Sequence, residues 1–151
     1  MKIVVDTNIV FSAILNSSSQ IGKILIHSKD YFQFYTCDFL KTEILKHRSR
    51  LQKLTGLTTA EIEELESLVI ENITFINEGL IPETILASTE ILLKEIDLND
   101  TPFVALTRHL KAKLWTGDKR LTKGLIARKF KDIITTAELS KLSDELEREL
   151  A

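Results

Sequence analysis

Short apolar runs alternate with longer amphipathic stretches along this chain, beginning with residues 2–5. These four residues are mostly β-branched and bounded by polar ones, which is typical of a strand buried on both faces. Comparable runs at residues 32–36, 73–76 and 114–116 predict three more strands, and residues 133–135 predict a weak fifth. The stretches between the runs carry apolar residues at helical spacing, so strands and helices are expected to alternate.

Polar caps mark where the predicted helices begin and end. Asp38 is expected to cap a helix that Gly56 ends, Thr58 or Thr59 to cap the next, and Asp100 or Thr101 to cap a later one with Pro102 in its first turn. The helix after Thr58 should turn its glutamates to solvent; these are Glu61, Glu63, Glu64 and Glu66.

Alternation of strands and helices implies a parallel sheet covered by helices on both faces. We therefore predict an α/β fold with three layers, α/β/α, around a central parallel sheet of four to five strands. The length of 151 residues predicts one domain over residues 1–151.

Charge and cysteine content narrow the classes of protein to consider. The formal net charge is −2, so no global positive field indicates a nucleic-acid partner. Basic residues nevertheless gather at 41–53 and 108–131, where solvated helix faces are the simpler interpretation. Cys37 is the only cysteine, which excludes an internal disulfide and favours a reducing, cytoplasmic setting.

The sequence indicates neither a membrane-spanning segment nor a zinc site. No apolar run approaches the roughly 20 residues that a membrane span needs. Asp6 interrupts the first apolar run, unlike in a signal peptide. The three histidines, His27, His47 and His109, are scattered without the spacing of zinc ligands.

Five carboxylates fall at the ends of predicted elements or in first helical turns: Asp6, Glu43, Asp97, Asp100 and Asp118. Asp6 and Asp118 both follow strands, and the carboxyl ends of parallel strands share one edge of the sheet, where ligands bind in open α/β folds. Helix capping, or attraction to the positive end of a helix dipole, is the structural alternative for each acid.

Carboxylates that converge on one place repel each other. Two unit charges about 4 Å apart cost roughly 4 kcal/mol at an effective dielectric of 20, so such a cluster takes up protons or binds a cation. Because the ligands are oxygens only, the cation should be hard, Mg²⁺ or Mn²⁺. A metal at a sheet edge suits phosphodiester hydrolysis, since it activates a water and stabilises the leaving oxyanion.

Four motifs together resemble those of the PIN-domain nucleases in residue type, order and spacing, over nearly the whole chain. They are Asp6-Thr-Asn8, Glu43, Asp100-Thr-Pro-Phe-Val-Ala105 and Thr116-Gly-Asp118. The likeness is strongest to the PIN proteins that are toxin components of bacterial and archaeal toxin–antitoxin pairs, related to VapC. The particular likenesses there are Asp6-Thr-Asn-Ile-Val-Phe-Ser12-Ala and Asp97-x-x-Asp100-x-Pro-Phe.

The resemblance implies a metal-dependent endoribonuclease that acts on single-stranded RNA. By position, the catalytic residues that hold Mg²⁺ or Mn²⁺ would be Asp6, Glu43, Asp100 and Asp118. Asp97 would be a further metal ligand, or a base acting through water, while Asn8 and Thr116 would orient the ligands. Relatives often carry another acid two places after the one matching Asp118, where this chain has Arg120. This departure speaks against a full second metal site, and Arg120 could contact phosphate instead.

Partners are also implied by the resemblance. Candidates for contacts with RNA phosphates are Lys41, Lys46, Lys119 and Arg120, although surface solvation is the simpler interpretation of each. A homodimer is expected through the apolar stripes of residues 21–28 and 58–70, and a cognate antitoxin protein is a possible partner.

Two other classes of function stay open at this point. One is a receiver- or phosphatase-like Mg²⁺-binding α/β domain, although residue 8 is Asn and not the second carboxylate that such domains carry. The other is a non-catalytic module that keeps the PIN fold for binding protein partners.

Overall fold

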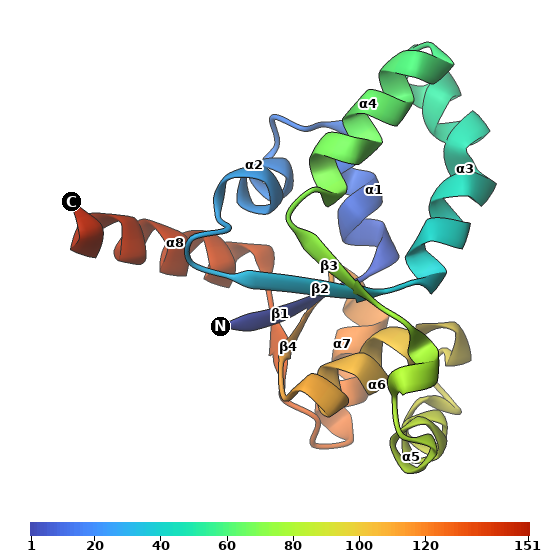
Figure 1. Ribbon diagram of the computed structural model, residues 1–151. Coiled ribbons are helices and arrows are strands. Elements are labelled where there is room, and N and C mark those ends of the chain that lie inside the picture. The colour runs from blue at the N-terminus through green and yellow to red at the C-terminus, as the bar shows by residue number, and fades with distance from the viewer.

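A computed structural model describes residues 1–151, and at its centre lies a sheet of five strands that all run parallel in the order β3-β2-β1-β4-β5 (Figure 1). The strands are β1 (Lys2–Val5), β2 (Gln33–Cys37), β3 (Ile73–Ile76), β4 (Lys113–Trp115) and β5 (Ile133–Ile134). Helices cover both faces of the sheet, so the predicted three-layer α/β fold is confirmed.

The central strand is β1, and its position follows from its sequence. Val4 pairs with Tyr35 of β2 on one side and with Leu114 of β4 on the other. Ile3, Val4 and Val5 are fully buried, as expected for a strand with helices packed on both faces. Asp6, the residue directly after β1, therefore lies at the middle of the carboxyl edge of the sheet.

The helices divide between the two faces (Figure 1). On one face lie α1 (Thr7–Leu15), α2 (Gln20–His27), α3 (Phe39–Thr55), α4 (Thr59–Ile70) and α8 (Thr136–Leu150). On the other lie α5 (Glu83–Leu93), α6 (Thr101–Leu110) and α7 (Lys119–Ala127). Two short 3-10 turns precede α5 and α6: η1 (Glu78–Leu80) and η2 (Leu98–Asp100). Each face buries its own apolar cluster, built around Trp115 on one side and Phe103 on the other.

The helix ends follow most of the predicted signals. Thr58 caps α4 in a capping box with Glu61, and Gly56 ends α3 in the left-handed conformation at φ 72°. The expectation for Asp38 is wrong, because its backbone is already helical and its side chain makes no capping hydrogen bond. The Phe39 N–H at the start of α3 donates instead to the Glu78 carboxylate, which comes from the turn after β3.

The expectation that Glu66 faces solvent is also wrong. Its side chain lies on the same face of α4 as the buried Ile62 and Val69, and the residue is only 4% exposed. Arg48 of α3 reaches it with an Nη2–Oε1 distance of 2.7 Å, so the buried carboxylate is paired. This ion pair joins α3 to α4 where the two helices rise above the sheet (Figure 1).

The apolar stripes of α2 and α4 pack into the hydrophobic core of the same chain. Ile24 and Leu25 of α2, together with Ile62 and Val69 of α4, are buried in the core of the first face. These side chains therefore cannot form the dimer surface expected from the sequence. No single helix is long and apolar enough to cross a membrane; α1 and α2 together pass by length and composition, but are bent by 104°.

Candidate active site at the carboxyl edge of the sheet

Asp6 and Asp118 stand at the ends of the neighbouring strands β1 and β4. Asp6 is 4% exposed and its Oδ1 accepts a hydrogen bond from Ile9 N at 3.1 Å, at the start of α1. Asp118 Oδ1 accepts from Leu121 N at 3.0 Å, at the start of α7. In both residues a single carboxylate oxygen serves as the helix cap. Capping and metal binding are therefore compatible functions for these two acids.

Asp100 is free of any capping function. It precedes α6, but its side chain makes no capping hydrogen bond, and its Oδ2 is buried without a hydrogen-bond partner. Burial is the largest cause of a raised pKa at Asp100, and together with the nearby charges of Asp97, Asp6 and Asp118 it brings that pKa to about 7. A buried acceptor without a donor is costly, which points to a missing partner at this position.

Asp6 belongs to the same electrostatic group. Burial raises its pKa, and Asp118 contributes in the same direction, whereas the Thr116 hydroxyl and the Ile9 N–H lower the pKa through hydrogen bonds. The fold thus brings Asp6, Asp100 and Asp118 together from three elements. Asp97 lies exposed at the rim, where its Oδ1 accepts from Asn99 N at 3.0 Å.

Glu43 lies on α3 and is not among the charges that raise the pKa of Asp6 or Asp100. It lines an open cleft of about 750 Å³ between α1 and α3, and Asp100 lines the same cleft. The Glu43 carboxylate lies 3.2 Å from His47, Oε2 to Nε2, one turn further along the helix. Glu43 therefore shares the cleft with Asp100, but the polar side chain that it contacts belongs to its own helix.

The two residues expected to orient the acids differ in their contacts. The Thr116 hydroxyl hydrogen-bonds Asp6, and its oxygen accepts from Asp118 N at 3.1 Å, so it links the two strand ends. The Asn8 side chain makes no hydrogen bond to Asp6, which corrects that expectation. Backbone N–H groups in the first turn of α1 hold Asp6 instead, and Asn8 lines the cleft.

The four basic residues predicted to meet phosphate fall in three places. Lys46 lines the cleft beside Glu43. Lys41 does not line it, because its Nζ lies 4.8 Å from the centre of the Phe75 ring and 3.6 Å from Asp38 Oδ1. Lys119 and Arg120 line a separate hollow next to Asp118, beside Thr116.

The cleft residues that were not predicted from the sequence include three whose side chains can contact a nucleic acid. They are Phe11 of α1 and His47 and Arg50 of α3. The two on α3 follow Glu43 by four and seven residues, which is the spacing of one helical face. Continuing the face of Glu43 along its helix would have found both of them.

The donor set fits a hard divalent ion, although the side chains are not arranged as a finished coordination site. No three His, Cys, Asp or Glu side chains have the geometry of a metal site in this structure. The grouped donors are nonetheless carboxylate oxygens, the ligands that Mg²⁺ and Mn²⁺ prefer, and one of them, Asp100 Oδ2, is buried without a partner.

The chain belongs to the PIN domain family, because the family model for PIN domains matches residues 4–143. PIN domains are generally nucleases and typically use divalent metal ions. Among solved structures, the fold is similar to a chain of VapBC2 from Rickettsia felis, determined bound to a DNA fragment from the promoter. The TM-score is 0.66 at 14% identity, over 89% of this chain and 97% of that one. At this identity the likeness shows the fold alone.

No curated protein matches the chain in sequence.

Proposed function

We propose that this protein is an endoribonuclease that cleaves single-stranded RNA with Mg²⁺ or Mn²⁺, acting as one PIN domain over residues 1–151. The observation that carries the proposal is Asp100 Oδ2, buried without a partner beside Asp6 and Asp118. A divalent cation would satisfy this oxygen and offset the mutual repulsion of the three acids.

Each acid has a part in the proposed reaction. Asp6, Asp100 and Asp118 would hold the ion from the sheet edge, and Glu43 would complete the site from α3. When bound, the ion supplies an activated water and stabilises the leaving oxyanion. Asp97, exposed at the rim, has one oxygen outside its capping bond and can accept a proton from water.

The presence of Arg120 where a second metal site would need an acid bears on the number of bound ions. A second site would need a further acid near Asp118, and the chain presents Arg120 on the first turn of α7 instead. We therefore propose one ion, with the guanidinium available to phosphate from the neighbouring hollow.

The nuclease proposal is tested with purified protein and a labelled single-stranded RNA. Cleavage is expected with Mg²⁺ or Mn²⁺, and its loss is expected in EDTA and in the Asp6→Asn variant. Asn keeps an oxygen to cap α1, so the variant should remain folded by circular dichroism. Equal cleavage by wild type and Asp6→Asn, or in EDTA, would remove the proposal.

A toxin of a toxin–antitoxin pair is the setting we propose, in the cytoplasm. The support is the PIN family and a fold shared with a chain of VapBC2, which was determined bound to a DNA fragment from the promoter. We also propose a homodimer, which rests on the family resemblance because the stripes of α2 and α4 are buried. Light scattering at micromolar protein should give twice the monomer mass.

A receiver-like domain is less well supported. Such a domain needs a second carboxylate close to Asp6, and Asn8 occupies the position where the pattern would place it. No contact in the structure favours a receiver-like domain over a nuclease.

A further inference from the structure

The cleft between α1 and α3 extends beyond the acids. One face of α3 lines the cleft, and its residues recur at helical spacing. Along the helix this face changes from acidic to basic to apolar: first Glu43, then Lys46, His47 and Arg50, and finally Leu54. The facing wall is one face of α1, with Phe11 and Ser12 among its residues. An anionic chain with its scissile group at the acids would meet cations next.

Two cations of this cleft, Lys46 and Arg50, form no ion pair within the protein. Two other basic residues of α3 turn away from the cleft and are paired: Lys41 with Asp38, and Arg48 with Glu63 and Glu66. Lys46 and Arg50 have no carboxylate within 4.0 Å, although they lie on the same helix. Unpaired cations lining a concave surface are what a phosphate backbone requires.

The phenyl ring of Phe11 lines the same cleft as these cations. Phe11 stands edge-on to His47, with ring centres 5.5 Å apart and planes 75° apart, and both side chains line the cleft. A partly buried phenyl ring beside cations is the usual platform for an unpaired base in proteins that bind single strands. Ser12 and Asn8 add hydroxyl and amide groups that can hydrogen-bond sugars or base edges.

We propose that the α1–α3 cleft is the binding path for the nucleotides next to the cleaved bond of a single-stranded RNA. Lys46 and Arg50, one helical turn apart, contact successive phosphates, and Phe11 stacks on a base. This inference rests on the proposed nuclease function and adds where the substrate lies. A protein segment fits less well, because helix recognition uses a continuous apolar groove and the middle of this cleft is cationic.

Binding is measured without cleavage, so that the two proposals can fail separately. A fluorescent single-stranded oligoribonucleotide is titrated with Asp6→Asn protein in EDTA, and its anisotropy is followed. In that background Lys46→Gln and Arg50→Gln should each weaken binding about fivefold. The double variant should flatten the dependence of log affinity on log salt by about 1.4, because each phosphate contact contributes about 0.7 in a single strand. Phe11→Leu should weaken binding about tenfold without changing the salt slope.

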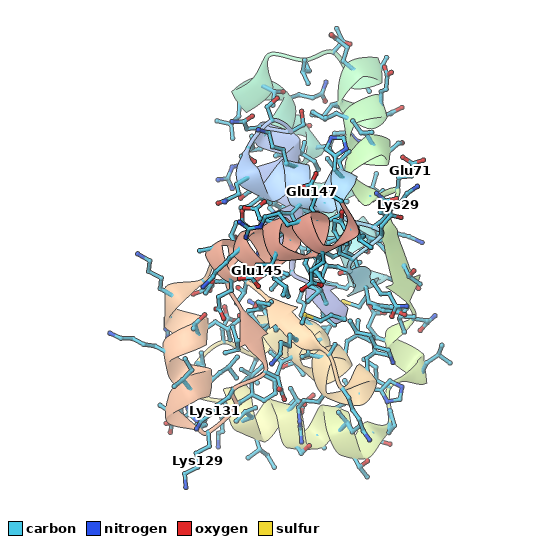
Figure 2. The ribbon with its side chains drawn as sticks, turned by 90° about the vertical axis from the view of Figure 1, so that its left-hand side faces the viewer. Lys29, Glu71, Lys129, Lys131, Glu145 and Glu147 are labelled. Carbon is cyan, nitrogen blue, oxygen red and sulfur yellow. The ribbon has the colours of Figure 1, made fainter.

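Lys53→Gln is the matched control, because Lys53 is exposed on the same helix, carries the same charge and does not line the cleft. It should bind as the parent does. A second comparison uses Lys129 and Lys131, which lie between α7 and β5 near the bottom of the view in Figure 2.

The proposal is overturned if Lys46→Gln and Arg50→Gln bind as tightly as Lys53→Gln. It is equally overturned if the affinity falls only in a Lys129→Gln/Lys131→Gln variant, or if no single-stranded RNA binds. If the cleft variants lose binding while wild-type protein with Mn²⁺ leaves the RNA intact, the binding path stands and the nuclease function fails.

Discussion

At the scale of single residues, the site depends on acids that sit where a helix cap would also be expected. Asp6 and Asp118 were predictable, because an acid directly after a buried strand is a local signal in the sequence. That each uses a single oxygen for its cap is visible only in the structure. The freedom of Asp100 was not predictable, since an acid before a proline-containing first turn normally caps its helix.

At Asp118 the capping function and the proposed catalytic function can be tested separately. Asp118→Asn keeps an acceptor for Leu121 N but loses the charge, so the free energy of unfolding should change by less than about 0.5 kcal/mol. Cleavage should fall by more than about 100-fold, because even residues that only support a metal ligand commonly cost 10–100-fold. Asp118→Ala should lose both the activity and about 1 kcal/mol of stability. Chemical denaturation and a cleavage assay check both effects; an active Asp118→Asn protein would argue against a metal ligand here.

The raised pKa of Asp100 makes the stability of the metal-free protein depend on pH. Because the pKa is about 7 in the folded chain against an ordinary 3.8, the folded state favours the neutral acid. The resulting stabilisation is fully present below pH 4 and is lost as pH rises through 7. Allowing for solvent screening, the wild type should lose on the order of 2 kcal/mol more than Asp100→Asn over this range in EDTA. The free energy of unfolding of both proteins is measured by urea denaturation at each pH. Equal dependence on pH in the two proteins would contradict a raised pKa at Asp100.

At the scale of elements, α3 is central, because it carries both Glu43 and the cationic face of the cleft. Its first turn makes a contact that the local sequence did not indicate. Phe39 N donates to Glu78, 39 residues away, whereas the adjacent Asp38 does not cap the helix. Burial and the neighbouring Glu78 carboxylate also raise the pKa of the buried Cys37 thiol, which precedes α3, to about 12. Caps of this kind escape sequence reasoning because the donor and the acceptor meet only after the sheet has formed.

Exchanging the two candidate caps tests this arrangement. Glu78→Ala should cost about 1 kcal/mol of stability and reduce RNA cleavage, because the start of α3 and hence Glu43 lose an anchor. Asp38→Ala is the matched control and should stay within about 0.5 kcal/mol, since the only charged partner of the Asp38 side chain is the exposed Lys41. A larger loss in Asp38→Ala than in Glu78→Ala would reverse the assignment.

At the scale of the whole molecule, the strand order β3-β2-β1-β4-β5 decides which acids meet. It makes β1 and β4 neighbours, so that Asp6 and Asp118 lie side by side at one edge although they are more than a hundred residues apart. The alternation of apolar runs was enough to predict the elements and the class of fold. The order of the strands depends on long-range pairing, which no local pattern encodes.

The charge distribution follows the same large-scale division. Lys129 and Lys131 lie near the bottom of the view in Figure 2, while Glu145 and Glu147 lie on α8 above them. The acid cluster lies at the carboxyl edge, away from these residues, because the segment after α7 leads into the amino end of β5. The net charge of −2 therefore hides separate basic and acidic regions.

The central claim is that acids from separate elements share one divalent ion at the sheet edge. Anomalous X-ray scattering from a crystal soaked in Mn²⁺ tests this most directly. The account predicts an anomalous peak coordinated by oxygens of Asp6, Asp100 and Asp118, with Asp100 Oδ2 among the ligands. A crystal that takes up Mn²⁺ only elsewhere, with these three carboxylates unbridged, would contradict it.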